Sequence, residues 1–330
     1  MLRYYPLHSY YKQRYGRRVQ KIPLDGGFTC PNRDGFLSAK GCVFCNDDGA
    51  GSGLLGNGLS LTQQWEHWRK KFHDKYSNPI FIAYFQSYSN TYGPLKKIEK
   101  MFKEVVSLPE LVGIYLGTRP DCIDEDKLAL LASQDVDEIQ LDMGLQSSNE
   151  ITLEYINRGH TAACFAEATE KAAARGLKVC AHVMMGLPAA HLPEGKEGLP
   201  ELLETVRFLN ELPIHGIKFH NTLVGPNTEL ARMWKKGTYI PMTRDEYMHQ
   251  ISHALAHTRP DIVVQRIQAD ALPDELLAPM WTDSKGRLIR ATNRYLDTFD
   301  FWQGMKFDPW TKEVPPWFPE DAEGPWAYKK

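Results

Sequence analysis

The chain has 330 residues, of which 42% are hydrophobic and 24% are charged, and 39 basic against 41 acidic residues give a formal net charge of −2. These values are typical of a globular protein and exclude disordered, collagen-like and coiled-coil chains. The near-neutral charge argues against a protein that coats nucleic acid through its overall charge, while it permits a local basic patch. No apolar run approaches the roughly 18 residues that span a bilayer, and the aromatic, basic N-terminus lacks the apolar core of a secretory signal. We therefore expect a cytoplasmic protein with no membrane partner.

Short β-rich runs alternate with amphipathic helical segments along the whole chain. Continuous apolar runs predict buried strands at 19–24, 80–85, 111–116, 137–143, 177–185 and 215–222, with a seventh at 261–267. Apolar spacing and capping residues predict helices at 60–76, 94–105, 124–131, 149–159, 162–175, 199–212 and 244–257. Strands that alternate with helices indicate βαβ units and a parallel sheet.

Six such units predict an α/β fold, a partial (β/α)6 TIM-type barrel. We assign the barrel and an N-terminal cysteine loop to residues 1–225. We assign a C-terminal extension, made of helices, a strand and an apolar strap that begins at Phe301, to residues 226–330. Because active sites of such barrels lie at the carboxyl ends of the strands, the residues just after each strand are the informative ones.

Three of the six cysteines, Cys30, Cys42 and Cys45, fall within 16 residues, just after the first predicted strand. Three thiolates can bind three irons of a [4Fe–4S] cluster and leave the fourth iron open for a substrate or cofactor. A zinc site completed by His8 or His67 and a set of buried, unligated thiols remain as alternatives. The other cysteines are Cys122, Cys164 and Cys180.

The segment Cys42-Val43-Phe44-Cys45 resembles the Cys-x-aromatic-Cys ending of the radical S-adenosylmethionine (SAM) superfamily. Eleven residues separate Cys30 from Cys42, where many members have three. This longer gap resembles the group of the Elongator catalytic subunit and is similar to a widespread bacterial family of radical SAM proteins. The resemblance to that bacterial family extends over roughly residues 5–300. It implies that the three cysteines are metal ligands and that Phe44 lies beside the cofactors.

Polar segments after the second and third strands extend the resemblance. Gln86, Ser87 and Asn90 occupy the loop that binds the amino group of SAM in the superfamily, although an ordinary polar turn would read the same. Gly117-Thr118-Arg119-Pro120-Asp121 is similar to the Glu-Thr-Arg-Pro-Asp of Elongator-like members, with Gly117 in place of the glutamate. The resemblance adds Thr118 and Arg119 to the cofactor residues. Arg119 could pair with the SAM carboxylate or form an ion pair with Asp121.

After the fourth strand, Gly144-Leu145-Gln146-Ser147 and Arg158-Gly159-His160-Thr161 resemble a paired motif of the same group. The resemblance implies that Gln146 and Ser147 face the ribose and carboxylate of SAM and that Arg158 binds the carboxylate. It also implies that the backbone at Met185 lies against the adenine. A solvated helix end for Arg158 and a core position for Met185 are the competing interpretations.

Three residues are candidates for a catalytic role near this pocket. His182 and His220 lie on the fifth and sixth predicted strands, and Cys122 follows the motif of the third. Satisfied core histidines and an unreactive buried thiol are the alternatives for them. Gln265, Arg266, Gln268 and Asp270 follow the seventh strand and are further pocket candidates.

The resemblance implies a radical SAM enzyme. In such enzymes a reduced [4Fe–4S] cluster cleaves SAM to a 5′-deoxyadenosyl radical, which abstracts hydrogen from a substrate. An electron donor such as flavodoxin or ferredoxin would reduce the cluster. A non-catalytic iron–sulfur or zinc scaffold is the alternative. For the substrate, RNA is suggested by tRNA-modifying relatives and by a basic, tyrosine-rich N-terminal stretch that contains Lys12, Arg14, Arg17, Arg18 and Lys21 with Tyr10, Tyr11 and Tyr15. A solvated basic face is the alternative for this stretch.

Overall fold

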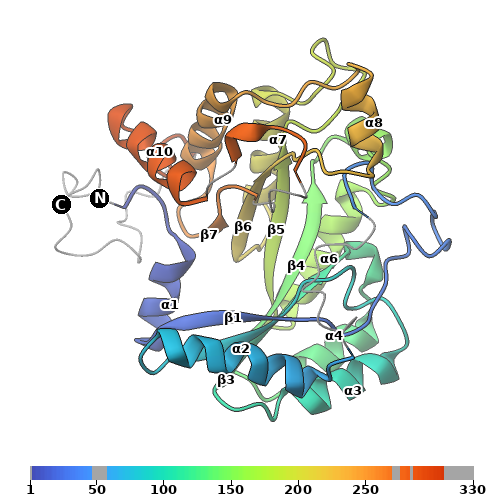
Figure 1. Cartoon of the computed structure of the whole chain (residues 1–330), viewed down its shortest axis with the longest axis vertical. Coiled ribbons are helices and arrows are strands. Elements are labelled where there is room, and N and C mark those ends of the chain that lie inside the picture. The colour runs from blue at the N-terminus through green and yellow to red at the C-terminus, as the bar shows by residue number, and fades with distance from the viewer. Residues whose placement is uncertain (1, 47–57, 270–275, 283–284, 308–330) are drawn as a thin grey trace.

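Seven parallel strands form one curled sheet, in which each strand is hydrogen-bonded to the next along the chain (Figure 1). The computed structural model describes residues 2–46, 58–269, 276–282 and 285–307. The strands are β1 (Val19–Leu24), β2 (Ile80–Phe85), β3 (Leu111–Thr118), β4 (Ile139–Gln146), β5 (Lys178–Met185), β6 (Gly216–Asn221) and β7 (Val263–Arg266). The partial TIM-type barrel is therefore confirmed, and the seventh strand lies in the segment predicted as the C-terminal extension.

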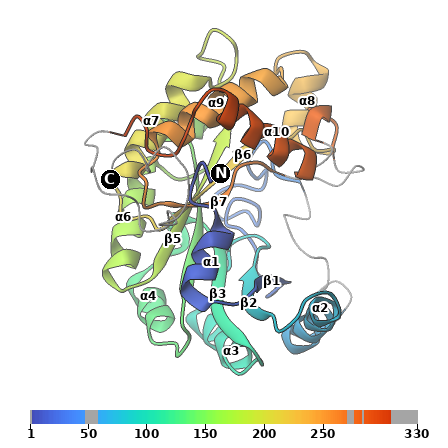
Figure 2. The same ribbon diagram turned by 90° about the vertical axis from the view of Figure 1, so that its left-hand side faces the viewer.

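Most of the helices cover the convex side of the sheet (Figures 1 and 2). The described helices are α1 (Leu7–Tyr15), α2 (Leu61–Lys75), α3 (Leu95–Val105), α4 (Glu125–Ala132), α5 (Glu150–Tyr155), α6 (Ala162–Ala174), α7 (Leu199–Asn210), α8 (Glu229–Lys235), α9 (Arg244–His257) and α10 (Lys285–Thr298). Several begin at the caps expected from sequence: Asp124 accepts a hydrogen bond from Lys127 N, and Thr243 with Glu246 forms a capping box. The sequence did not predict α1, α8 or α10.

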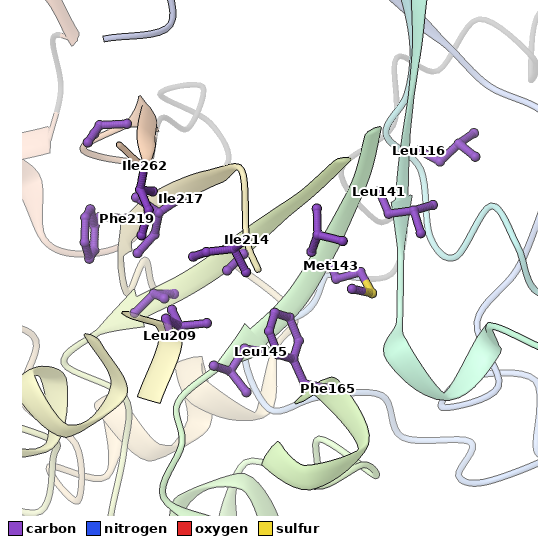
Figure 3. Close-up of a cluster of buried hydrophobic side chains, with 14 of the residues drawn as sticks. Leu116, Leu141, Met143, Leu145, Phe165, Leu209, Ile214, Ile217, Phe219 and Ile262 are labelled. Carbon is purple, nitrogen blue, oxygen red and sulfur yellow. The ribbon is translucent and has the colours of Figure 1, made fainter. Parts of the chain in front are cut away.

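The main core lies between the outer face of the sheet and these helices (Figure 3). Alternate residues of each strand face outward, for example Leu141, Met143 and Leu145 of β4. Phe165 of α6 and Leu209 of α7 pack in the same cluster. These contacts fix the sheet, and with it the positions of the strand ends.

A second, tyrosine-rich cluster fills the inner side of the sheet at its amino end. The hydroxyls of Tyr10 and Tyr115 both donate to the buried Glu138 carboxylate, which also pairs with Lys178. Tyr11 is buried beside them, with its hydroxyl 3.4 Å from that of Tyr115. Helix α1 therefore closes the amino end of the barrel.

This arrangement removes Tyr10, Tyr11 and Lys21 from any RNA-binding surface, and the other basic residues of the N-terminal stretch lie exposed, as a solvated basic face requires. Tyr10 and Tyr11 are buried and unable to stack on bases, and Lys21 lies inside the barrel against the rings of Tyr84 and Tyr115. The stretch also lies at the amino ends of the strands, whereas the cysteine loop lies at their carboxyl ends. The physical reason is that its aromatic rings are more stable in the barrel interior than in water.

The N-terminal segment also runs along β7 at the open side of the barrel (Figure 2). Val264 N donates to Tyr5 O at 2.7 Å, and Gln303 N donates to Arg3 O at 2.8 Å. The beginning of the chain and residues 301–307 thus lie side by side. The remainder of the predicted apolar strap, 308–330, lies outside the described residues. None of the described helices has both the length and the apolar character needed to cross a membrane.

The outer core gives a direct test of this packing. Phe165 is fully buried, so Phe165→Ala should lower the free energy of unfolding by about 3–5 kcal/mol. The control Phe299→Ala removes a ring that is 58% exposed and should cost less than about 1 kcal/mol. Denaturant unfolding of both variants measures the difference, and equal losses would contradict the assignment of Phe165 to the core.

Candidate functional site

The three predicted ligand cysteines lie on one loop that follows β1 at the carboxyl end of the sheet, and all three are free thiols. The carbonyl of Cys30 accepts hydrogen bonds from Arg33 N at 2.9 Å and Asp34 N at 3.1 Å. Cys45 N donates to Cys42 O at 3.0 Å, so the last two cysteines share a tight turn. Phe44 between them is half-buried against the main core and against a small cluster around α8.

The cysteine loop is fastened to the segment that follows α5. Asn32 Nδ2 donates to Asn157 O, and Asn157 Nδ2 donates to Gly41 O, each at 2.6 Å. Val43 N adds a bond to Ile156 O at 3.1 Å. Asn157 has a φ of 54°, a conformation that asparagine tolerates better than most residues. The sequence motif around Arg158 therefore serves partly to hold the cysteine loop in place.

Arg158 connects this loop to the end of β4. Its Nη2 donates to Gly144 O at 2.7 Å, and its Nη1 lies 3.7 Å from Cys42 Sγ. The side chain is buried, and among the described residues its Nε has no hydrogen-bond partner. A Cβ at residue 144 would lie 2.5 Å from Nη2 and from Gln146 Nε2, so a larger residue there would displace both side chains. The solvated helix end considered for Arg158 is thus excluded.

The charge environment favours an ionised thiol at Cys42. A hydrogen bond with the Cys45 thiol and the positive charge of Arg158 lower the pKa of Cys42 to about 5, against the opposing effect of burial. The same contact with Cys42, together with burial, raises the pKa of Cys45. Thiolates are the metal-binding form of cysteine, and the guanidinium of Arg158 is suited to stabilise one before a metal arrives.

Arg119 is buried and forms an ion pair with Asp121, which was one of its two possible partners in the sequence analysis. Its Nε and Nη2 donate to the two carboxylate oxygens of Asp121 at 2.8 and 2.7 Å. Its Nη1 donates to Arg158 O at 2.9 Å. The two-pronged side of the guanidinium is therefore directed at Asp121, and Arg119 supports the Arg158 segment.

The β2 and β3 loops explain why glycine replaces the glutamate of the related motif. A Cβ at Gly117 would lie 3.1 Å from Phe85 O, so a larger side chain would press on the backbone of β2. Asn90 holds the same region: its Nδ2 lies 3.1 Å from Phe85 O and 2.9 Å from Gly117 O. Thr118 is engaged in a buried hydroxyl cluster with Ser89 and Thr91, two residues that the sequence did not single out.

Two acceptors in this loop have no hydrogen-bond partner among the described residues. They are Asn90 Oδ1 and Ser87 Oγ, and both are buried. Gln86 beside them is half-buried. Buried polar atoms are nearly always paired, so these two atoms are available to a bound polar group or an ordered water.

At the end of β4, a carboxyl group that the sequence missed joins the site. Ser147 Oγ donates to Glu197 Oε1 at 2.6 Å, and Glu197 is only 3% exposed. Burial raises the pKa of Glu197 to about 7. Gln146, which precedes Ser147, is buried with a φ of 78°. Nothing in the sequence near Glu197 marks it, because its partner lies 50 residues earlier.

Comparisons with known proteins decide the family. Residues 38–191 match the model described as the radical SAM superfamily, and residues 214–297 match the radical SAM C-terminal domain. The YtqA protein of Bacillus subtilis is 32% identical over 306 residues, which cover 92% of this chain and 93% of YtqA. The chain belongs to the radical SAM superfamily. It is an enzyme of this class.

Two further comparisons bear on the Elongator-like group. A tRNA uridine(34) acetyltransferase of Methanocaldococcus jannaschii is 31% identical over 178 residues, which cover 54% of this chain and 32% of that protein. The solved structure of the archaeal Elp3 of Methanocaldococcus infernus shares the fold, with a TM-score of 0.68 at 17% identity over 87% of this chain and 64% of that one.

The residues of this radical SAM enzyme fit its expected cofactors. The three free thiols can ligate three irons, and Arg158 adds a buried positive charge beside them. The unpaired atoms Arg158 Nε, Asn90 Oδ1 and Ser87 Oγ can meet the carboxylate and amino groups of SAM. Met185 offers less, because its side chain packs in the outer core and its carbonyl accepts hydrogen bonds from Thr222.

The inner face of β4, β5 and β6 carries the histidine candidates. The rings of His182 and His220 stack at 5.2 Å, and His182 Nε2 lies 3.7 Å from Asp142 Oδ2. Burial lowers the pKa of His182 to about 4 and also lowers that of His220, so both imidazoles are neutral at pH 7. Neutral imidazoles in the barrel can accept a proton or a hydrogen bond from a substrate.

Two buried thiols near these elements are protonated at neutral pH. Burial raises the pKa of Cys122, whose sulfur lies 3.9 Å from Asp121 Oδ1, to about 12. Burial also raises the pKa of Cys180 to about 12. Cys180, Asp142 and His182 have ligand atoms within 4.8 Å of one another, but Lys218 already neutralises the Asp142 carboxylate. This group is therefore better described as a buried ion-pair cluster than as a metal site.

The Glu197 carboxyl predicts a pH-dependent stability. Because its folded pKa is about 7 and its ordinary value is 4.5, its contribution is present below pH 4.5 and is lost as the pH rises through 7. Glu197→Gln keeps the acceptor for Ser147 and removes the ionisation, so the variant should be more stable than the wild type at pH 8 by about 3 kcal/mol. At pH 4 the two should be nearly equal. Denaturant unfolding at both values measures this, and parallel pH profiles would contradict a buried carboxyl.

Proposed function

We propose that the enzyme holds a [4Fe–4S] cluster through Cys30, Cys42 and Cys45, with one iron left open for SAM. The cluster and SAM would supply a 5′-deoxyadenosyl radical that abstracts hydrogen from the substrate. The observation that carries the proposal is the cysteine loop, which is pinned beside the buried Arg158 with Cys42 poised as a thiolate.

Each strand end has a defined task in this proposal. Arg158 holds the SAM carboxylate, since the carboxylate-binding edge of Arg119 is taken by Asp121. Asn90 Oδ1, Ser87 Oγ and the amide of Gln86 accept the SAM amino group. Gln146 and Ser147 line the ribose, and the backbone at Met185 and the ring of Phe44 bound the adenine. Thr118 positions this loop through its hydroxyl cluster.

The barrel interior supplies a chamber for the radical that α1 closes at its amino end. His182, His220 and Cys122 are our candidates for contact with the substrate, as neutral groups on or near the inner face. We divide the chain into a cofactor-binding part, 1–225, and a part that completes the sheet with β7, 226–330. A cytoplasmic flavodoxin or ferredoxin would deliver the electron.

A non-catalytic cluster or zinc scaffold would account less well for the site. Such a scaffold has no need of buried acceptors without partners at the strand ends, because each one costs stability. Ser87 Oγ and Asn90 Oδ1 are such acceptors. They favour a protein that binds SAM over one that only holds a metal.

For the substrate class we propose tRNA, on the basis of the relative named tRNA uridine(34) acetyltransferase, whose match covers 54% of this chain. The tRNA would approach the carboxyl ends of the strands, where the cysteine loop lies. Helix α1 lies at the opposite end and would not take part.

The cysteines give the test of the cluster. After anaerobic reconstitution with iron and sulfide, the wild type should be brown with broad visible absorption, and Cys30→Ala, Cys42→Ala or Cys45→Ala should abolish it. Cys164→Ala is the control and should keep it, because Cys164 lies on α6 and is not one of the three cysteines of the loop. A protein that binds only zinc after anaerobic work would contradict the proposal.

Crosslinking tests the substrate class. Ultraviolet crosslinking of the reconstituted enzyme to tRNA should label peptides of the loops at 25–46 and 186–198, and the variant Arg17→Gln/Arg18→Gln should crosslink equally well. Both arginines lie beside α1 at the amino end of the barrel. Crosslinks confined to α1, or their complete absence, would contradict tRNA binding at the carboxyl ends.

A further inference from the structure

A cavity of about 390 Å³ lies on the open side of the barrel, between β1 and β7. Its outer wall is the N-terminal segment around Tyr4 and Pro6, and its inner wall includes Tyr84 of β2 and Lys218 of β6. It therefore reaches the barrel interior from the side rather than from the end that carries the cysteines.

A β-bulge directs an arginine into this cavity. In the pairing of β6 with β7, Ile217 lies opposite Val264 and Lys218 lies opposite Arg266, so Gln265 is the extra residue. Because Arg266 shares the register position of Lys218, both side chains face inward. Gln265 also faces inward, where it exchanges hydrogen bonds with Gln140 across the barrel. A regular strand would have turned Arg266 outward.

The described lining of the cavity is basic and contains no acidic residue. Arg3 is neutralised by Asp297 and Asp300, and Lys218 by Asp142. Lys21 and Arg266 have no carboxylate within 4.0 Å among the described residues. Lys21 Nζ lies 3.3 Å from Gln265 Oε1 and over the rings of Tyr115 and Tyr84, at 4.5 and 5.1 Å.

The nearest carboxylate that acts on Lys21, Asp142, is already paired with Lys218, so three cationic side chains share one anionic partner in this interior. Such an excess of buried positive charge is unfavourable unless another anion joins it. We propose that this cavity binds an anionic group of the substrate, a carboxylate or a phosphate, between Lys21 and Arg266. That the bound anion belongs to the substrate rests on the proposed function. A part of the substrate then extends from the carboxyl ends of the strands to the lateral opening between β1 and β7 and carries negative charge at that point.

The protonation state of the Lys21 amine is consistent with anion binding and allows that binding to be measured. Burial and the charge of Lys218 lower the pKa of Lys21 to about 7, so much of its amine is neutral and nucleophilic at pH 7.5. A bound anion would favour the charged form and slow any reaction of the amine.

The test is reductive methylation of the full-length enzyme with formaldehyde and cyanoborohydride at constant ionic strength, followed residue by residue by peptide mass spectrometry. Saturating inorganic phosphate or acetate should slow methylation of Lys21 about tenfold. Lys103, whose side chain is 74% exposed, should react at an unchanged rate and serves as the internal control. Methylation of Lys21 at the same rate with and without both anions would overturn the proposal.

Substitutions test whether Arg266 is the second cation that contacts the anion. Arg266→Gln should raise the anion concentration needed for protection about tenfold to a hundredfold, and Arg266→Lys should restore part of the loss. Arg232→Gln removes an exposed arginine of α8 and is the matched control. Unchanged protection in Arg266→Gln would contradict the assignment.

Two comparisons separate the remaining questions. Protection by tRNA at concentrations below those of phosphate assigns the anionic group to a nucleotide, and protection by free anions alone assigns it to a small molecule. An enzyme that shows protection but does not cleave SAM would contradict the proposed function and retain the anion site. An enzyme that cleaves SAM without protection of Lys21 would contradict only the anion site.

Discussion

The buried guanidinium of Arg158 is the contact on which the site depends. It lies between the carbonyl of Gly144, at the end of β4, and the sulfur of Cys42 in the cysteine loop. Arg119 supports it from β3 by donating to its carbonyl while bound to Asp121. A charge that is buried this far needs partners, and Gly144 O together with the Cys42 sulfur, whose pKa Cys45 and Arg158 both lower, supplies them.

The barrel interior is layered along its axis. Tyrosines of α1 and β3 seal the amino end around Glu138, and a polar layer of Asp142, Lys218 and the stacked histidines lies above them. The cysteine loop lies at the carboxyl ends. A reactive radical needs a chamber from which water is excluded, and the sealed amino end closes one side of it. The lateral cavity between β1 and β7 gives a substrate access to the barrel interior.

The sequence predicted most of the sheet because buried parallel strands read as continuous apolar runs, as in 80–85. The sequence did not predict helix α1, because its buried face is made of tyrosines. Burial of Tyr10 is stabilised by hydrogen bonds with Glu138 and Lys178, which lie far away in the sequence. The cysteines and Arg158 were found by spacing and motif. Glu197, the anchoring role of Asn157 and the inward direction of Arg266 were not, because each depends on a contact or a bulge that joins distant segments.

The most direct test of the account is the formation of 5′-deoxyadenosine. The anaerobically reconstituted enzyme, given SAM and dithionite, should release 5′-deoxyadenosine in proportion to its bound cluster. A protein that carries a complete [4Fe–4S] cluster and releases none would contradict the claim that the three cysteines and Arg158 form a site for radical SAM chemistry.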